Sequence, residues 1–149
     1  MERPDWDSIF MEICQTLSKR STCIRLQTAA LVVKKLNIIS IGYNGCPSKM
    51  IHCMDRWKGI NLENNLQFLE EHHHWSMANE LHAEINALLR CKSDVQDATM
   101  YSLYSPCIQC AKAIVSAGIK EVVYLYSYDR DLQHTMELFW ANGIVFRMI

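Results

Sequence analysis

One stretch of the chain reads Thr99-Met100-Tyr101-Ser102-Leu103-Tyr104-Ser105-Pro106-Cys107-Ile108-Gln109-Cys110. Its first half, up to Tyr104, is a run of β-branched and aromatic residues, which is typical of a strand. Serine is a frequent N-cap and proline is favoured at the first helical position, so Ser105-Pro106 predicts that a helix begins there. We expect this helix to run to Ala117 and to stop at Gly118. The stretch therefore predicts a strand that leads straight into a helix.

The rest of the C-terminal half repeats this unit. A strand is predicted over 121–126, a helix from about Asp129 to Trp140 that stops at Asn142-Gly143, and a strand over 144–147. Helices that alternate with strands call for parallel strands and right-handed crossovers, and hence for an α/β fold. The other predicted elements are a helix over 9–17 capped by Asp5 or Asp7, an antiparallel pair of strands over 29–33 and 38–41, an irregular functional loop from Gly42 to about His74, and an amphipathic helix from Asn79.

The composition limits the class of protein. At 149 residues, of which 50% are hydrophobic, the chain has the size of one globular domain, so we expect residues 1–149 to form a single domain. No stretch resembles a signal peptide or a membrane span, which predicts a cytoplasmic protein without membrane contacts. A net charge of −1 argues against large nucleic acids as partners. Seven cysteines, an odd number, favour metal binding over disulfides.

Two short motifs carry the chemistry. His82-Ala83-Glu84 and Pro106-Cys107-Ile108-Gln109-Cys110 together form the H-x-E … P-C-x-x-C signature of zinc-dependent nucleobase deaminases. As ligands, His82, Cys107 and Cys110 leave a fourth tetrahedral position of the zinc open for the attacking water. Glu84 is then the catalytic proton shuttle and not a ligand. The predicted reaction adds hydroxide, formed from the zinc-bound water, to C4 of a cytosine ring and yields uracil.

The placement of the motifs on helices bears on this interpretation. His82 and Glu84 are two residues apart, about 200° around an ideal helix, so they converge only on a point just beyond its end. We therefore expect the helix to start close to His82 and the metal to lie between two helix N-termini, where thiolates are favoured. A structural zinc, or a chance C-x-x-C beside an unrelated histidine, is the alternative. A structural site normally has a fourth protein ligand.

Five stretches recur, in this order, in one enzyme family: Ile38-Ile39-Ser40-Ile41-Gly42-Tyr43-Asn44-Gly45, Asn79-Glu80-Leu81-His82-Ala83-Glu84-Ile85-Asn86-Ala87-Leu88, Tyr104-Ser105-Pro106-Cys107-Ile108-Gln109-Cys110-Ala111-Lys112, Gly118-Ile119-Lys120 and Tyr128-Asp129. The sequence resembles the deoxycytidylate (dCMP) deaminase family, within the wider cytidine deaminase superfamily, from about Leu17 to the C-terminus. The resemblance implies a three-layer α-β-α sandwich around a five-stranded mixed sheet, commonly assembled as a homohexamer. It also implies deamination of dCMP to dUMP in pyrimidine deoxynucleotide metabolism.

The resemblance further implies contacts with the nucleotide. Asn44 matches the asparagine that holds the deoxyribose, and Tyr128 matches an aromatic residue packed beside the nucleotide. The Ala83 backbone N–H and the Ser105 backbone carbonyl match groups that read the pyrimidine edge. Structural roles are the alternatives, since Asn44-Gly45 also favours a turn and Tyr128 could be ordinary packing.

Some family members carry a second, structural zinc. The resemblance implies that Cys23, Cys53, His72 and Glu80 hold it in this chain. Two cysteines, one histidine and one glutamate can close a tetrahedral shell and would fix the long loop beside the catalytic zinc. The two histidines after His72 offer the same imidazole ligand. The alternative to a second zinc is a buried thiol and a solvated run of histidines.

Two stretches depart from the family pattern. Thr28-Ala29-Ala30 stands where the family often has Val-Gly-Ala, and Ser48-Lys49-Met50 replaces a glycine-rich loop. In regulated members this region helps to bind dCTP as activator and dTTP as inhibitor. Because the region differs here, the sequence leaves open whether this chain binds the same two effectors. Arg25 and Gln27 are candidates for phosphate contacts, with solvated surface as the alternative.

Three other functions remain open from the sequence. A bifunctional deaminase could accept dCMP and also dCTP, the latter with Mg²⁺. A tRNA adenosine deaminase shares the zinc motif, although the near-neutral charge and the Tyr43-Asn44-Gly45 loop count against it. A catalytically inactive, zinc-stabilised nucleotide-binding protein is the third, and the presence of Glu84 opposes it because a carboxylate that is not a ligand has no structural need to be there.

Overall fold

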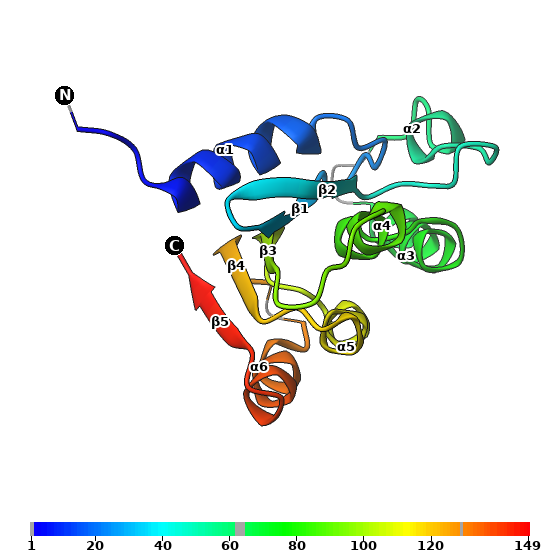
Figure 1. Ribbon diagram of the computed structural model, residues 1–149. Coiled ribbons are helices and arrows are strands. Elements are labelled where there is room, and N and C mark those ends of the chain that lie inside the picture. The colour runs from blue at the N-terminus through cyan, green and yellow to red at the C-terminus, as the bar shows by residue number, and fades with distance from the viewer. Residues whose placement is uncertain (1, 62–64, 129) are drawn as a thin grey trace.

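The computed structural model describes residues 2–61, 65–128 and 130–149 of the chain. In these residues a five-stranded mixed sheet runs in the order β2-β1-β3-β4-β5 (Figure 1). The strands are β1 (Ala29–Lys34), β2 (Asn37–Tyr43), β3 (Thr99–Tyr104), β4 (Glu121–Tyr126) and β5 (Val145–Met148). The helices are α1 (Trp6–Ser18), α2 (Cys53–Arg56), α3 (Leu66–Asn79), α4 (Ala83–Arg90), α5 (Ile108–Ala117) and α6 (Leu132–Ala141). The predicted α/β fold with a mixed sheet is confirmed.

Strands β1 and β2 form the predicted hairpin. They pair antiparallel, and Lys35 and Leu36 make a two-residue turn with φ of 51° and 62°. Two residues of positive φ are what a type I′ turn requires, and its twist matches that of the strands. β1 also pairs antiparallel with β3, whereas β3, β4 and β5 are mutually parallel. The parallel strands predicted for the C-terminal half are therefore confirmed.

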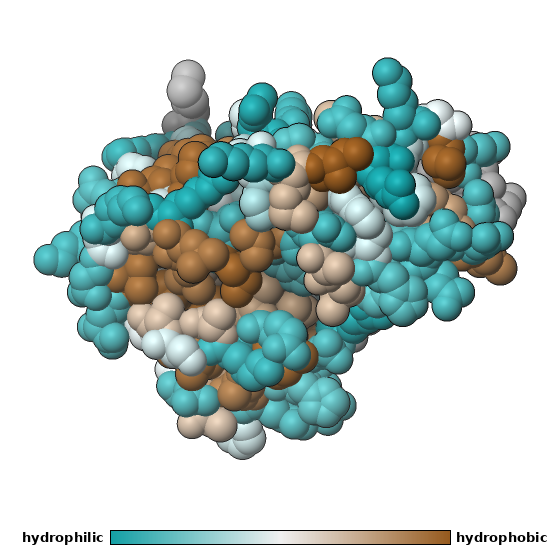
Figure 2. Space-filling view, turned by 90° about the vertical axis from the view of Figure 1, so that its right-hand side faces the viewer, coloured by the Kyte–Doolittle hydropathy of each residue, from teal (hydrophilic) through white to brown (hydrophobic). Residues whose placement is uncertain are grey.

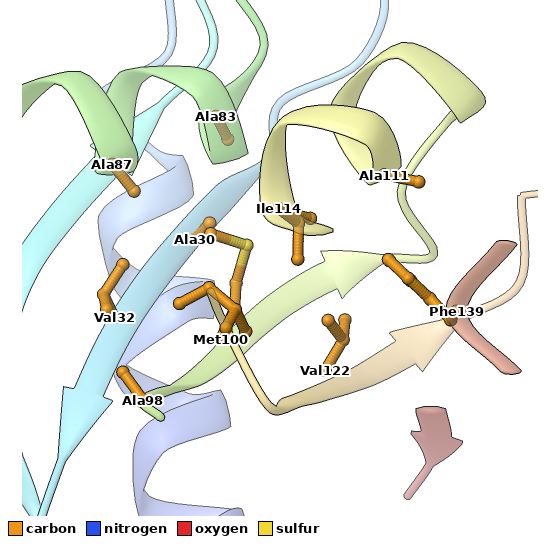
Figure 3. Close-up of a cluster of buried hydrophobic side chains, with 11 residues drawn as sticks. Ala30, Val32, Ala83, Ala87, Ala98, Met100, Ala111, Ile114, Val122 and Phe139 are labelled. Carbon is orange, nitrogen blue, oxygen red and sulfur yellow. The ribbon is translucent and has the colours of Figure 1, made fainter. Parts of the chain in front are cut away.

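Helices cover both faces of the sheet, as predicted for a three-layer α-β-α sandwich (Figure 1). On one face, Phe10, Met11 and Cys14 of α1 join a buried cluster with residues of β1, β3 and β4. On the other face, α4, α5 and α6 enclose a second cluster (Figure 3). Its helical members on α4 and α5 are mostly alanines, Ala83, Ala87 and Ala111, so these two helices lie close to the strands.

Helix α4 lies very close to the sheet at Gly42 of β2. A Cβ atom at this position would overlap the carbonyl oxygen of Ala83 and the amide nitrogen of Ala87. Asn86 of the same helix donates a hydrogen bond of 2.9 Å from Nδ2 to the Tyr43 carbonyl. Glycine at residue 42 thus sets how close the start of α4 lies to the edge of the sheet.

The predicted start of the helix that follows β3 is wrong. Cys107, not Ser105, is the N-cap of α5, because the hydroxyl of Ser105 binds the backbone of Tyr128 and the Pro106 carbonyl accepts a hydrogen bond from Thr135. These contacts hold the serine and proline outside the helix, whose end at Gly118 (φ 84°) is as predicted. The last helix, α6, begins at Leu132, and the predicted start at Asp129 lies outside the described residues.

The loop predicted from Gly42 to about His74 is wrong in its second half, where α3 begins at Leu66. Its N-cap is Asn65, whose side chain accepts a hydrogen bond from the Phe68 N–H, and only Phe68 and His72 of the helix are buried. Among the residues that the structure describes, no helix is long and apolar enough to cross a membrane.

Candidate active site

The two motifs meet at the carboxyl end of β3. His82 is the N-cap of α4 and Cys107 the N-cap of α5, as the sequence predicted for a helix start close to His82. Both caps are extended, with ψ of 155° and 165°, so their side chains leave the helix ends instead of lying along the helix sides. Figure 3 shows Ala83, the first residue of α4, beside α5. The two helix N-termini are therefore neighbours above the sheet.

A short bridge holds this corner in place. Gly45 and Leu81 exchange two backbone hydrogen bonds, of 3.1 Å from the Gly45 N–H and 2.9 Å from the Leu81 N–H. The bridge ties the loop after β2 to the residue just before His82. It therefore fixes the relative position of Asn44 and the candidate metal ligands.

The three predicted zinc ligands lie together. The His82 Nδ1 atom is 3.5 Å from the Cys107 sulfur and 3.3 Å from the Cys110 sulfur. A tetrahedral zinc with ordinary Zn–N and Zn–S bonds places such donors roughly 3.5 Å apart. His82 is exposed whereas Cys110 is buried, so the site opens to solvent on the histidine side. The donor set and its spacing fit a zinc ion with one position left for a water or a substrate.

Hydrogen bonds among these three side chains shift their pKa values. A hydrogen bond with Cys110 lowers the pKa of Cys107 to about 3, and the same contact raises the pKa of Cys110. A hydrogen bond to Cys107 raises the pKa of His82 to about 9. Because zinc binds thiolates and neutral imidazole, its binding would displace the protons that Cys110 and His82 hold.

Glu84 lies beneath the three ligands. It is in the first turn of α4, its side chain is 6% exposed, and burial raises the pKa of its carboxyl group. Its Oε1 atom accepts a hydrogen bond of 3.4 Å from the Ser102 hydroxyl on β3. A buried carboxyl group of raised pKa, beside a candidate metal site, is suited to take up and release a proton.

A second group of metal-binding side chains lies under the loop that follows β2. One donor atom from each of Cys23, Cys53, His72 and Glu80 lies within 4.8 Å of the others. His72 Nε2 is 3.2 Å from the Cys53 sulfur and 3.8 Å from the Cys23 sulfur. His72 is buried, whereas His73 is half-buried and His74 exposed. The structure thus assembles the four predicted residues and distinguishes His72 from its two neighbours.

The chemistry of this second cluster suits a cation. Burial lowers the pKa of His72, which keeps the imidazole in the neutral form that binds metals. A hydrogen bond with Cys53 lowers the pKa of Cys23 to about 7. The Glu80 Oε1 atom is buried without a hydrogen-bond partner among the described residues, while Oε2 accepts from Ser76 at 2.7 Å. A buried acceptor without a donor is costly unless a cation or a water meets it.

Arg25 and Gln27 line a cavity of about 440 Å³. Neither residue belongs to one of the two clusters of metal-binding side chains. The cavity is lined by residues 22–27, Met54 of α2 and Tyr104 at the end of β3. Gln27 also donates a hydrogen bond of 3.2 Å from Nε2 to the Ser21 carbonyl. The structure thus brings both phosphate candidates to one cavity, next to the strand that leads into the C-x-x-C motif.

The Asn44 side chain is engaged with the backbone of the same segment. Its Nδ2 donates to the Leu26 carbonyl at 2.7 Å, and its Oδ1 accepts from the Thr28 N–H at 3.0 Å. Asn44 is 8% exposed. The structure therefore gives it a structural contact in addition to the deoxyribose contact predicted from the sequence.

The remaining predicted contacts surround the start of α5. Ala83 and Ser105 are buried, and Tyr128 is 38% exposed. The Ser105 hydroxyl accepts from the Tyr128 N–H at 2.7 Å and donates to the Tyr128 carbonyl at 3.3 Å. These two hydrogen bonds fix the Tyr128 backbone next to the C-x-x-C turn.

Comparison with known proteins decides the family. The model of the cytidine and deoxycytidylate deaminase zinc-binding region matches residues 4–126. The chain belongs to this family. Among its relatives, the deoxycytidylate deaminase of Enterobacteria phage T4 is 33% identical and aligns with 83% of this chain and 79% of its own length. The human deoxycytidylate deaminase is 32% identical over 96% of this chain and 79% of its own length.

Further relatives and solved structures resemble the chain over most of its length. ComE operon protein 2 of Bacillus subtilis is 34% identical over 100% of this chain and 74% of its own length. A crystal structure of a dCMP deaminase from the cyanophage S-TIM5, in complex with dCMP and dUMP, superimposes with a TM-score of 0.76 at 26% identity and covers both chains completely. A structure from a study of tRNA:A34 deaminases, at 17% identity and a TM-score of 0.56, has the same fold. The predicted resemblance to dCMP deaminases is confirmed.

The sequence did not predict the two serine hydroxyl contacts of this deaminase site. The sequence predicts Ser102 only as part of a strand, and Ser105 only as a helix cap and through its carbonyl group. The single available signal was a serine inside an otherwise β-branched and aromatic run, where a buried hydroxyl needs a partner. Which partner it would find depends on contacts with residues distant in sequence, Glu84 and Tyr128.

Proposed function

We propose that this chain catalyses the zinc-dependent hydrolytic deamination of dCMP to dUMP, as a hydrolase of pyrimidine deoxynucleotide metabolism. The observation that carries the proposal is the cluster of His82, Cys107 and Cys110 with the buried carboxyl group of Glu84 beside it. Three protein ligands and a nearby group that is not a ligand are the features of a catalytic zinc site. The relatives named deoxycytidylate deaminase support the choice of substrate.

When bound, zinc supplies a Lewis acid that lowers the pKa of a coordinated water to about 7. Glu84 takes a proton from the attacking water and delivers it to the ring nitrogen, and then carries a proton to the departing ammonia. Burial suits Glu84 to this role, because the raised pKa makes its carboxyl group a better base and lets it hold the proton between steps.

The other contacts orient the nucleotide. The Ala83 N–H is one of the free donors at the start of α4, and the Ser105 carbonyl lies just before the start of α5, so the pair offers a donor and an acceptor to the pyrimidine edge. Tyr128 packs beside the base and Asn44 holds the deoxyribose. Arg25 and Gln27, at the cavity next to Tyr104, are proposed to meet the phosphate.

A second zinc is proposed at Cys23, Cys53, His72 and Glu80. These four side chains complete a tetrahedral shell, which makes the site structural and not catalytic. Their convergence and the unpaired Glu80 oxygen support it. The metal would connect three segments, which are the one before β1, the loop that follows β2, and helix α3. It would thereby fix the wall of the cavity that carries Arg25.

The assembly and the compartment are also proposals. A homohexamer is proposed from the family resemblance and from exposed large apolar side chains such as Met77, Leu89 and Trp140. One face of the molecule shows apolar residues among polar ones (Figure 2). A cytoplasmic location suits the reduced thiols that both clusters require. Regulation by dCTP and dTTP stays a prediction. Use of dCTP with Mg²⁺ as a substrate is one outcome of the experiment below.

The experiment is a competition between substrates. The zinc-loaded protein is incubated with equimolar deoxycytidine, dCMP and dCTP with Mg²⁺, and the products are separated by chromatography. We expect dUMP as the main product, and we expect Glu84→Ala to keep its zinc and its fold while deamination falls by at least about a hundredfold. Conversion of dCTP alone would replace the proposed substrate, and full activity in Glu84→Ala would remove Glu84 from the mechanism. No conversion by the wild-type protein would favour a nucleotide-binding role.

A further inference from the structure

We propose that Ser102 is a positioning residue for the catalytic carboxylate: its hydroxyl holds Oε1 of Glu84, so that Oε2 faces the reacting atoms. The inference rests on the proposed function, because it assigns the proton transfer to Glu84. It adds a residue outside both sequence motifs. The carrying observation is the contact of 3.4 Å between the Ser102 Oγ and the Glu84 Oε1.

The position of Ser102 in the sheet makes its hydroxyl unusual. Side chains alternate along β3, so Ser102 shares a face with Met100, while Tyr101 and Leu103 face α1. The Met100 side of this strand is covered by α4 and α5 and is lined by the alanine-rich apolar cluster (Figure 3). Ser102 is 0% exposed. An apolar residue would suit this position, and a hydroxyl there is costly unless it has a partner.

The backbone of Ser102 is well placed to hold a side chain still. β3 is the central strand of the sheet, and Ser102 lies opposite Ala30 on β1 and Tyr124 on β4. Glu84, in contrast, projects from the first turn of α4, so its carboxyl group has several rotamers open to it. A hydrogen bond from the rigid strand to one carboxylate oxygen restricts these rotamers.

Orientation of this carboxylate has a kinetic consequence. Proton transfer requires the donor and acceptor atoms to stand at hydrogen-bond distance with good alignment, and small displacements of a reacting group cost large factors in rate. A carboxylate oxygen that accepts from Ser102 is less available to the water or the pyrimidine ring. The second oxygen, Oε2, is then the one that carries the proton. Loss of the hydroxyl should therefore lower kcat and leave KM unchanged.

The test compares Ser102→Thr with Ser102→Val. These two side chains have the same shape, and only threonine keeps the hydroxyl, so any difference between them reports the hydrogen bond. We expect kcat for dCMP to fall about tenfold in Ser102→Val and in Ser102→Ala, with KM within about twofold, and to be largely retained in Ser102→Thr. Zinc content should be unchanged in all three variants.

Ser40→Ala is the matched control. Ser40 is a second buried hydroxyl of the sheet, and it donates a hydrogen bond of 2.6 Å to α4, at the Ala87 carbonyl instead of at Glu84. This variant should lose stability and keep its kcat. Equal kcat values in Ser102→Val, Ser102→Ala and the wild type would overturn the proposal, and so would an equal loss in Ser102→Thr and Ser102→Val.

Crystal structures of the zinc-loaded wild type and Ser102→Ala provide a readout that does not depend on turnover. The proposal requires the Glu84 carboxylate to change its orientation in the variant, and an unmoved carboxylate would contradict it. A wild-type protein without activity on dCMP would defeat the proposed function, and these two structures would still decide the role of Ser102.

Discussion

At the scale of single residues, the two candidate metal sites are separable. Cys107 belongs to the cluster at the helix N-termini, and Cys53 to the cluster under the loop. We expect the purified protein to carry about two zinc ions per chain. Cys107→Ser should lose one zinc together with deamination, because three ligands are the minimum for the catalytic site. Cys53→Ser should also lose one zinc, yet keep part of its activity and melt at a lower temperature. Metal analysis and thermal unfolding measure both effects.

Cys91→Ser is the control for these cysteine variants. Its thiol donates to the carbonyl groups of Ile39 and Ser93 and belongs to neither cluster. Its zinc content should equal that of the wild type. A wild-type content of about one zinc per chain, unchanged in Cys53→Ser, would contradict the second site.

Residue patterns explain why one cluster was easier to predict than the other. The ligands His82, Cys107 and Cys110 lie in two short motifs whose spacing is diagnostic, and both motifs lie at helix starts. Cys23, Cys53 and His72 are scattered, and only the resemblance to a family suggested that they meet. The sequence does not decide which of the three consecutive histidines is the ligand. Packing against Trp57 and Phe68 places His72, and not its neighbours, in the protein interior.

At the scale of elements, the contact of β2 with α4 sets the geometry of the active site. Gly42 allows the strand to touch the helix that begins at His82 and carries Glu84. Gly42→Ala would push the two apart, because the new Cβ meets backbone atoms that cannot rotate away. We expect a loss of about 3 kcal/mol in the free energy of unfolding, measured by urea denaturation, and a reduced kcat.

Gly59→Ala separates this steric effect from the conformational cost of replacing a glycine. Gly59 has φ of 80°, and a Cβ there would meet nothing within 4 Å. Its replacement should cost about 1 kcal/mol, from the left-handed backbone conformation alone. Equal losses in the two variants would mean that the contact between β2 and α4 relaxes without strain.

The elements that could be predicted share a strong local signal. The hairpin needed only a short turn between two runs rich in β-branched residues, and α5 ended at a glycine as expected. Helix α3 lacked such a signal, because only Phe68 and His72 of the helix are buried and its sequence shows no apolar stripe. Packing against Trp57 and the cluster of Cys23, Cys53 and Glu80 stabilises it, and these contacts are invisible to a local pattern.

At the scale of the whole molecule, the two ends of the chain are joined across the sheet (Figure 1). Arg147 on β5 donates to Asp7 on α1 at 2.7 Å and to Glu121 on β4 at 2.8 Å. Tyr101 on β3 donates to the other oxygen of Asp7 at 2.6 Å. The network ties the first helix to three strands, on the face opposite to the active site.

This network predicts how stability depends on pH. The hydrogen bond from Arg147, together with the one from Tyr101, lowers the pKa of Asp7 in the folded protein below its usual value of 3.8. Because the folded pKa is depressed, the stabilisation is fully present above pH 3.8 and is lost as the pH falls through the folded pKa.

Asp7→Asn should therefore cost about 1 kcal/mol at pH 7 and progressively less below pH 4, as measured by urea denaturation at several pH values. Asp55→Asn, a change on the exposed side of α2, should show no such trend. A cost in Asp7→Asn that stayed constant down to pH 2 would mean that the carboxylate charge contributes nothing, and that α1 is held by its apolar contacts alone.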